Sequence, residues 1–224
     1  TEDTFDAVTA DDFANDSNGN ISLRSAIQET NSFAGEAIIA LPSGTYTLTR
    51  TGTNEDLAST GDLDINDHLT IRGAGADTTF IDGGALDRLF DIAPNVTFVL
   101  SGVTIQNGAA EFGAGIYNEA GNVILQDVVI TGNVASGSAT NESHGGGISN
   151  NQGNMRLERV TVTGNSAEED GGGVHSFSGF IEVNDSSIDN NTSTRFGGGL
   201  ALEGGTADVI DSTIANNTAT DDGG

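Results

Sequence analysis

The chain of 224 residues contains no cysteine and no lysine, only two prolines, and only 5% aromatic residues. The absence of cysteine excludes disulfides, thiolate metal sites and thiol nucleophiles. With 33 acidic residues against seven arginines, the formal net charge is −26, a charge that nucleic acids and anionic membrane surfaces repel. No apolar run approaches the roughly 18 residues that a membrane-spanning helix needs. We therefore expect neither nucleic-acid binding nor membrane insertion of this segment.

Glycine, by contrast, is abundant, with 32 positions, and much of it lies in an internal repeat. Four segments that begin at Gly113, Gly145, Gly171 and Gly197 align without gaps, and the last three begin 26 residues apart. The first step is six residues longer, because an insertion lies between Val134 and His144. The Ser, Thr, Asn and Gly content of this insertion predicts a surface loop.

Apolar residues alternate within each repeat, as short strands require. Three columns of the alignment are apolar throughout: Ile116, Ile148, Val174 and Leu200; Leu125, Leu157, Val183 and Val209; and Ile130, Val162, Ile188 and Ile214. One repeat cannot bury its apolar face alone, whereas stacked repeats share a continuous core. The sequence therefore predicts an all-β, single-stranded parallel β-helix, right-handed like other parallel crossover connections.

Each repeat also places an asparagine three residues after its last apolar column, namely Asn133, Asn165, Asn191 and Asn217. Stacked asparagines at a corner can bond the backbone of adjacent coils and tolerate left-handed backbone angles. We predict that these residues form a structural ladder and have no catalytic role.

The amino-terminal segment departs from the repeat and contains the best helix candidate, Ile21–Thr30. Ser22 is a suitable N-cap residue, and the apolar residues after it share one helical face. A strand is predicted before the helix, over residues 4–9.

These elements divide the chain into two parts. Residues 1–36 are predicted to form a cap, a strand plus an amphipathic helix, that covers the open apolar end of a β-helix over residues 37–224. The chain stops two glycines into another repeat. We therefore expect the β-helix to be truncated at its carboxyl end and the chain to be a fragment of a longer protein.

The segment ISLRSAIQETN is followed by LPSGTYTLT, GDLDI, LTIRGAGADTTFIDGGALDRLF and the GGGI and GGGV repeats. This series resembles a family of secreted bacterial β-helix proteins whose cap carries a CSLREA-type motif. The repeats are similar to the GGAI and FxxN repeats of chlamydial polymorphic outer-membrane proteins. Ile21 stands where the cap motif has cysteine, Ser25 stands where it has glutamate, and Ile or Val replaces the Phe of FxxN. The resemblance covers essentially the whole chain. It implies a pectate-lyase-like solenoid, extracellular or at the cell surface, with an adhesive or structural role.

An enzyme is the main alternative, since many parallel β-helices act on acidic polysaccharides. Such lyases and hydrolases need paired carboxylates with basic groups nearby, or a calcium-binding carboxylate cluster beside a basic residue. The sequence shows neither pattern. We expect the histidines, His68, His144 and His175, to be exposed turn residues, and we predict that the chain is not an enzyme.

Asp62, Asp64 and Asn66 alternate with the apolar Leu63 and Ile65, so that a strand would project all three polar side chains on its outer face. Oxygen ligands at this spacing suit Ca²⁺, which takes about six to eight oxygens. A solvated acidic face is the other interpretation. No cofactor is required by the predicted fold, and Ca²⁺ is the ion that this motif favours.

We predict a non-catalytic extracellular rod, part of a surface adhesin, surface layer or filament. Its expected partners are copies of itself, associated end to end or laterally, or other cell-surface proteins or glycans. A carbohydrate-active enzyme and a carbohydrate-binding module are the alternatives. The module ranks below the structural role because few exposed aromatics are expected to stack on sugars, namely Tyr117, Phe177, Phe180 and Phe196. Repulsion among the carboxylates weakens with salt, which predicts seawater-like or calcium-containing surroundings.

Overall fold

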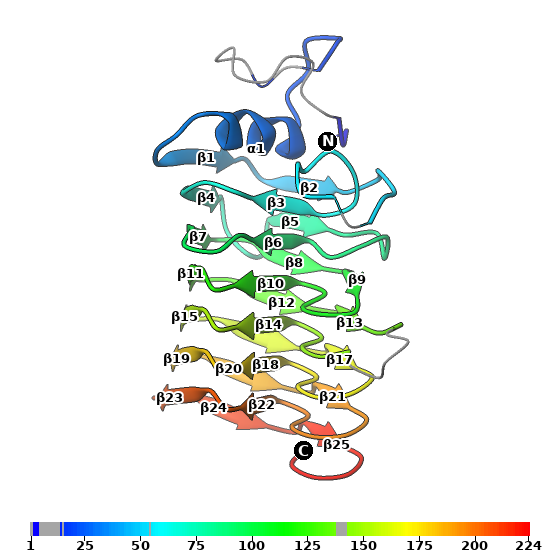
Figure 1. Ribbon diagram of the computed structural model, residues 1–224, viewed down its shortest axis with the longest axis vertical. Helices are drawn as coiled ribbons and strands as arrows, with labels where there is room; N and C mark the ends of the chain where they lie inside the picture. The colour runs from blue at the N-terminus through cyan, green and yellow to red at the C-terminus, as the bar shows by residue number, and fades with distance from the viewer. Residues whose placement is uncertain (1, 5–13, 15, 54, 138–142) are drawn as a thin grey trace.

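The computed structural model describes residues 2–4, 14, 16–53, 55–137 and 143–224. These residues form one helix, α1 (Leu23–Ser32), and 25 strands arranged in four sheets. Every pair of neighbouring strands within a sheet is parallel. Figure 1 shows the strands stacked in successive coils beneath α1. The predicted all-β parallel β-helix with an amino-terminal helix is confirmed.

From β6 onward, each coil contributes one strand to each of four sheets, which we label C, A, B and D in chain order. Sheet C contains β3 (Leu63–Ile65), β6 (Phe90–Ile92), β10 (Ile116–Glu119), β14 (Ile148–Asn151), β18 (Val174–Phe177) and β22 (Leu200–Glu203). Sheet A contains β1 (Ala37–Leu41), β4 (Leu69–Gly73), β7 (Thr97–Ser101), β11 (Asn122–Gln126), β15 (Asn154–Glu158), β19 (Phe180–Asn184) and β23 (Thr206–Ile210). Sheet B contains β2 (Gly44–Thr47), β5 (Thr79–Asp82), β8 (Thr104–Gln106), β12 (Val129–Thr131), β16 (Thr161–Thr163), β20 (Ser187–Asp189) and β24 (Thr213–Ala215). Sheet D contains β9 (Ala109–Ala110), β13 (Val134–Ala135), β17 (Ser166–Ala167), β21 (Thr192–Ser193) and β25 (Thr218–Ala219).

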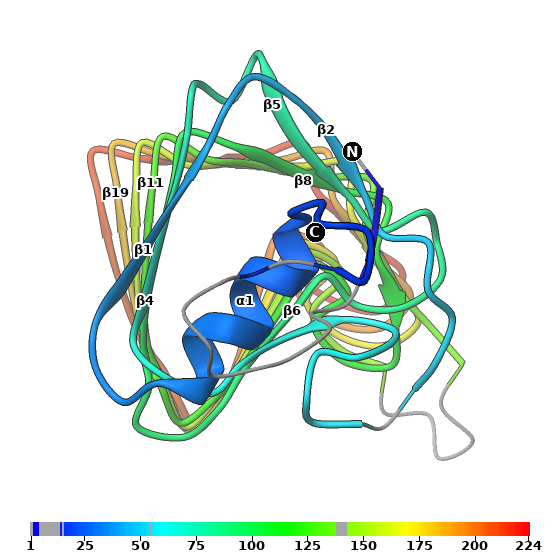
Figure 2. The same cartoon turned by 90° about the horizontal axis from the view of Figure 1, so that it is seen from above.

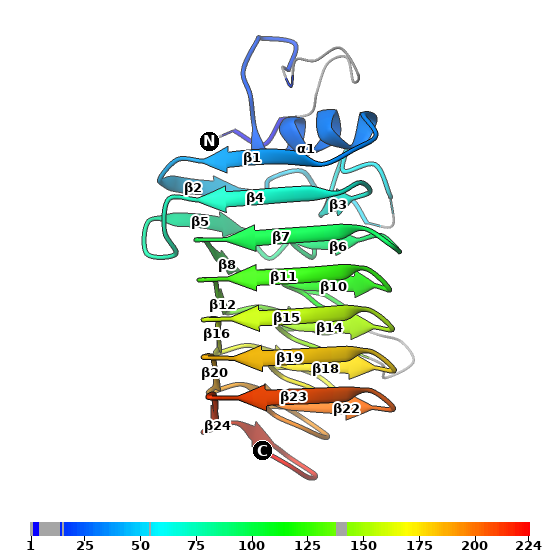
Figure 3. The same cartoon turned by 90° about the vertical axis from the view of Figure 1, so that its left-hand side faces the viewer.

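The coils enclose a roughly triangular cross-section with α1 lying across one end (Figure 2). Seen from that end, the chain runs clockwise as it recedes, from β1 to β2 and on to the next coil, so the solenoid is right-handed. Figure 3 shows the strands of sheet A directly one above another.

The three apolar columns predicted from the repeat fill the interior. Ile116 pairs with Ile148 in the next coil, and the same register continues to Val174 and Leu200. The other two columns follow the same rule in sheets A and B. All members before the last coil are at most 1% exposed, and burying one such side chain stabilises the fold by about 1.5–3 kcal/mol. In the last described coil, Val209 is 44% exposed.

The helix α1 begins where the sequence predicts it. Ser22 is the N-cap, and it exchanges hydrogen bonds with Ser25 in a capping box. Leu23 and Ile27 are buried in the core, and the helix packs on β3. This helix of the described chain is too short and too polar to cross a membrane. Most of the strand predicted over residues 4–9 lies outside the described residues.

Arg24 fastens the cap to the first coils. Its side chain is fully buried, and its Nε atom lies 2.6 Å from a carboxylate oxygen of Asp3. The two terminal nitrogens donate hydrogen bonds to the backbone carbonyls of Ala58, Gly61 and Asp62 at 2.7–3.1 Å. Arg24 thereby fixes the loop that leads into β3.

The predicted asparagine ladder lies at the corner between sheets B and D. The side-chain oxygens of Asn165, Asn191 and Asn217 each accept two hydrogen bonds from the asparagine one coil earlier, at 2.9–3.0 Å. Their amide groups donate to the carbonyls of the preceding coil, as Asn165 does to Ile130. In Asn133 the oxygen accepts from a backbone N–H of the coil before. The expected left-handed angle falls one residue earlier, at Gly132, Gly164, Asn190 and Asn216.

The predicted insertion loop leaves the coil after β13 and rejoins it at His144, which bridges to Phe112. Its central residues, 138–142, lie outside the described residues.

Candidate functional site

Sheet C carries the side chains that form the candidate site. The first residue of each strand points into the core, and the second points away from it because side chains alternate along a strand. The parallel register aligns these second residues from coil to coil. They form an outward column of Asp64, Asp91, Tyr117, Ser149, His175 and Ala201.

A second column comes from the turns that precede these strands. It consists of Phe112, His144, Asp170 and Phe196, and a glycine with positive φ follows each of them. A Cβ atom on these glycines would lie 2.2–2.5 Å from a backbone oxygen of the following strand. The first glycine of each GAG or GGG triplet is therefore required for the tight turn that brings the second column beside the outward column.

Three hollows of about 600, 620 and 550 Å³ follow one another along this face. Phe112 and Tyr117 line both the first and the second hollow. His175, Arg195 and Glu203 line both the second and the third. Because neighbouring hollows share walls, they form one continuous depression parallel to the coil axis, which we call the lateral groove.

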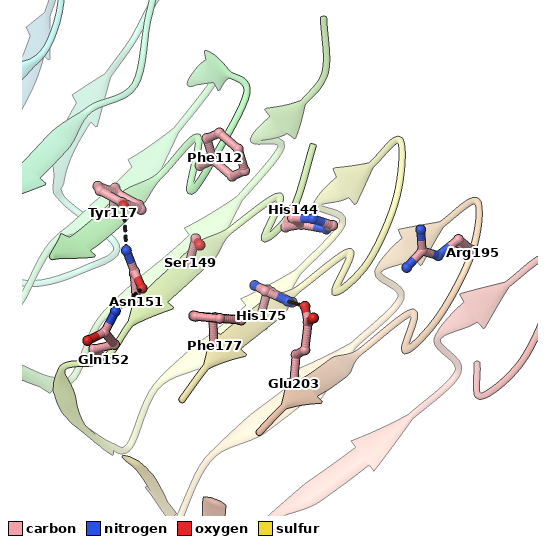
Figure 4. A pocket seen from close by; sticks show the side chains of 10 residues that line it. All are labelled: Phe112, Tyr117, His144, Ser149, Asn151, Gln152, His175, Phe177, Arg195 and Glu203. Atoms are coloured by element: carbon pink, nitrogen blue, oxygen red, sulfur yellow. Dashed lines mark hydrogen bonds and ion pairs between the residues drawn. The ribbon is translucent and has the colours of Figure 1, made fainter. Parts of the chain in front are cut away.

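Two histidines from successive coils occupy the middle of the lateral groove (Figure 4). The rings of His144 and His175 stack with their centroids 4.6 Å apart and their planes 19° from parallel. Asp170 approaches from the turn before β18, with a carboxylate oxygen 3.8 Å from Nδ1 of His144. His175 is 3% exposed, and burial, with a smaller effect of His144, lowers its pKa to about 4. It is therefore a neutral imidazole at neutral pH.

Aromatic and amide side chains border the histidines. The Tyr117 hydroxyl accepts a hydrogen bond of 3.0 Å from the side-chain amide of Asn151. The guanidinium of Arg88 lies 5.0 Å from the centre of the Tyr117 ring, and Phe112 packs at 6.4 Å from it. Phe177 is 42% exposed. The groove therefore combines apolar ring surfaces with hydrogen-bonding groups that converge on them, as ligand sites commonly do.

The amino-terminal end of the lateral groove is acidic. One carboxylate oxygen each from Asp62, Asp64 and Asp91 lies within 4.8 Å of the others. Arg88 forms ion pairs with Asp62 and Asp91, and the backbone N–H of Ala58 donates to Asp64 at 2.6 Å. Burial raises the pKa of Asp62 to about 7 and that of Asp64 to about 8, and it also raises the pKa of Asp91.

The predicted calcium motif differs from the structure in its burial and in its third oxygen donor. Asp62 and Asp64 are only 7% and 5% exposed, so the expectation of an outer, solvated face is wrong for them: the loop before β3 covers this end of the sheet. The third oxygen donor of their cluster is Asp91 from the next coil. Asn66 lies outside this cluster, exposed, with its amide group bonded to the carbonyl of Asp56. Binding of Ca²⁺ at Asp62 and Asp64 stays a prediction.

The expectation of exposed turn histidines is also wrong: His175 lies within β18 and is buried, and His68 and His144 are only partly exposed. The missed signal was in the aligned repeats, because Tyr117, Ser149 and His175 occupy the position after the first apolar column. Alternation places that position on the outer face of the sheet. The asparagine ladder, by contrast, lies inside the corner between sheets B and D, against the last glycine of each triplet, and its residues do not line the groove.

These features define a class of protein, a parallel β-helix solenoid with a groove along one lateral face. No protein-family model, curated protein or solved structure matches the chain.

Proposed function

We propose that this chain is an extracellular, non-catalytic solenoid that adheres to glycans through its lateral groove. The observation that carries the proposal is the continuity of the groove across successive coils, with shared walls between its hollows. A linear polymer that lies along the coil axis can contact side chains of several successive coils at once. Many weak contacts of this kind add to useful affinity when the polymer spans several of them.

The chemistry of the groove favours an uncharged glycan. Tyr117 and Phe177 offer ring faces, and the amides of Asn151 and Gln152 offer hydrogen bonds. Both arginines of the groove, Arg88 and Arg195, already pair with carboxylates. With a formal charge of −26 over the chain, a polyuronate or sulfated chain would be repelled.

The location at the cell surface is supported by the resemblance of the cap motif to secreted β-helix proteins. In this chain, Ser22 and Arg24 of that motif make the capping box and the buried contacts to the first coil. The motif therefore has a structural role, to join the helix to the first coil, that other secreted β-helix proteins with such a cap could share.

Self-association is the second part of the proposed role. The last described coil exposes the apolar residues Leu202, Val209, Ile210 and Ile214, each by 41–46%. Its strands β22 to β25 each pair on one side only in the described chain. Such edges pair with further strands, which either a further coil of the solenoid or a second copy of this chain would supply.

A carbohydrate-active enzyme is the second candidate, favoured by the acidic end of the groove. Carboxyl groups with raised pKa values that lie within about 5 Å of each other are typical of retaining glycosidases. Catalytic carboxylates must touch the substrate, however, and Asp62 and Asp64 are buried beneath the loop before β3. This burial is the reason that we favour adhesion.

Affinity electrophoresis through gels that contain soluble neutral polysaccharides tests the proposal. We expect retardation by at least one neutral glycan and none by polygalacturonate. Phe177→Ala should weaken the binding about tenfold, because the loss of one stacking contact costs about 1.4 kcal/mol.

Phe33→Ala is the matched control, since Phe33 is 41% exposed, nearly the same as Phe177, but follows α1 and lines none of the three hollows of the groove. Equal weakening by both variants, or no retardation by any neutral glycan, contradicts adhesion through the groove. Release of reducing ends from a retained glycan, abolished by Asp91→Asn, would instead establish the enzyme.

A further inference from the structure

The middle of the lateral groove holds a set of donor atoms that the proposed glycan contacts leave unused. His144 comes from the turn after the insertion loop, Asp170 from the turn one coil later, and His175 from β18. One possible ligand atom of each lies within 4.8 Å of the other two. Three residues of two successive coils therefore converge on one point.

The Nε2 atom of His175 is a buried polar atom whose position suits a bound ligand. It is buried and has no hydrogen-bond partner within the part of the chain that the structure describes. The residue is 3% exposed, and the nearest acidic group, a carboxylate oxygen of Glu203, lies 3.8 Å away, beyond hydrogen-bond distance. A buried polar atom without a partner destabilises the fold. A group bound at this position would remove that loss of stability.

We propose that His144, Asp170 and His175 bind a divalent transition-metal ion, with Zn²⁺ as the representative ion. Two imidazoles and one carboxylate are a ligand set that Zn²⁺ takes in proteins, with a fourth position open to water or substrate. Ca²⁺ and Mg²⁺ prefer oxygen ligands, and the two imidazole nitrogens therefore select against them.

The charges around the three residues suit a dication. The carboxylates of Glu169 and Asp170 pair with the guanidinium of Arg195, and the carboxylate of Glu203 lies 3.8 Å from His175. These three carboxylates and the guanidinium together give a formal charge of −2 beside the two imidazoles. The low pKa of His175 keeps its ring unprotonated at neutral pH, as metal coordination requires.

Small side-chain movements complete the site. Ligands of a tetrahedral Zn²⁺ lie about 3.4 Å from one another, given bond lengths of about 2.0–2.2 Å, so the three atoms must approach more closely. The stacked rings can tilt, because the terminal torsion of histidine is broad. Nδ1 of His144 already accepts a long hydrogen bond of 3.4 Å from the backbone N–H of Asp170, so its lone pair faces that residue. Asp170 is shared with Arg195, 3.0 Å away, and Glu203 can swing in from the groove as a fourth ligand.

Imidazole NMR of the unmodified chain is the direct test, because the sequence contains only three histidines. Titration with ZnCl₂ alone should shift the ring resonances of His144 and His175 until one equivalent is bound. The resonances of His68, which lies before β4, should stay unchanged, and EDTA should reverse the shifts. CaCl₂ should leave all three histidines unchanged. A shift of His68 alone, or no shift at several equivalents of ZnCl₂, overturns the proposal.

Variants separate specific binding from surface binding. Asp170→Asn and His175→Gln should each weaken the Zn²⁺ affinity in calorimetry by at least about 100-fold, since even second-shell changes cost about 10–100-fold. His68→Gln is the control and should bind as the parent does. Co²⁺ should give visible absorption bands of a four-coordinate site with the parent and lose them with either ligand variant.

If a ligand variant fails to fold, its circular dichroism shows it, and the NMR result on the parent decides alone. Unchanged affinity in folded ligand variants overturns the assignment. None of these measurements uses a glycan, so the metal site and the adhesion proposal stand or fall separately.

Discussion

At the scale of single residues, Asp64 is a carboxyl group whose surroundings disfavour its ionised form. It is 5% exposed, close to Asp62 and Asp91, and its main compensation is the hydrogen bond from the N–H of Ala58. Burial and the neighbouring Asp62 raise its pKa to about 8. Since its unfolded pKa is about 3.9, folding favours the protonated form. This contribution to stability is complete below about pH 4 and is lost as the pH rises towards about 8.

We therefore expect the thermal midpoint of the chain to fall between about pH 5 and about pH 9, with Asp64→Asn removing part of that fall. Asparagine keeps the acceptor for Ala58 and adds no charge. One pKa unit corresponds to about 1.4 kcal/mol, or about 3–6 °C in midpoint for a chain of this size. Scanning calorimetry in EDTA measures the difference. Asp77→Asn, in the exposed turn between β4 and β5, is the control, and an equal effect of the two changes would refute the explanation.

Only part of this residue-scale picture could be predicted from the sequence. Alternation around Leu63 and Ile65 identified Asp62 and Asp64 as a pair on one face of a strand. The third member, Asp91, comes from the next coil, and the cover comes from the loop that Arg24 holds in place. Both are contacts between segments far apart in the chain, which local spacing cannot reveal.

At the scale of elements, the asparagine ladder joins coils by hydrogen bonds that are shielded from water. Asn165 is 1% exposed and contacts both neighbouring asparagines and the carbonyl of Ile130. A second interior ladder went unpredicted: Asn118 donates to Asn150, which in turn donates to the hydroxyl of Ser176. The aligned repeats change from Asn to Ser at this position, and no uniform column marks it.

Asn165→Ala should lower the free energy of unfolding by about 2–5 kcal/mol, because it leaves the N–H groups of Asn133 and the carbonyl of Ile130 buried without partners. Asn154→Ala is the control. Asn154 also bonds an asparagine one coil away, Asn122 at 3.1 Å, but this pair is exposed. We expect the control to change stability by less than about 0.5 kcal/mol. Urea unfolding monitored by circular dichroism compares the two. Equal losses in the free energy of unfolding would mean that burial of the ladder does not contribute to stability.

At the scale of the whole molecule, the dominant quantity is the charge of −26. The stacked coils hold these carboxylates close together, so that their repulsion opposes both folding and the association of copies. Arginines reduce this repulsion at some places. Arg159 forms ion pairs with Asp127 in the preceding coil and with Glu158 beside it. Seven arginines cannot do this for 33 acidic residues.

Raising NaCl from about 0.01 M to about 1 M shortens the Debye length from about 30 Å to about 3 Å. We expect the thermal midpoint to rise by several degrees over this range, and the weight-average mass in sedimentation equilibrium to increase as the proposed self-association is released from repulsion. At the low salt concentration, micromolar CaCl₂ should raise the midpoint and EDTA should lower it if the acidic cluster binds calcium. Midpoints that are indifferent to salt and to EDTA would contradict both expectations.

The sequence alone determined the solenoid. A single repeat with alternating apolar residues cannot bury its apolar face, whereas repeats stacked coil on coil share one continuous core. The sequence also determined the helix start at Ser22 and the asparagine ladder, because each depends on neighbours in the chain or on strict repetition. The tertiary structure decided the lateral groove. His144, Asp170 and His175 break the repeat, and only the register of sheet C and the turns at Gly145 and Gly171 bring them together. Burial of single polar groups is likewise a property of the stacked coils, since water is excluded by segments that the local sequence does not contain.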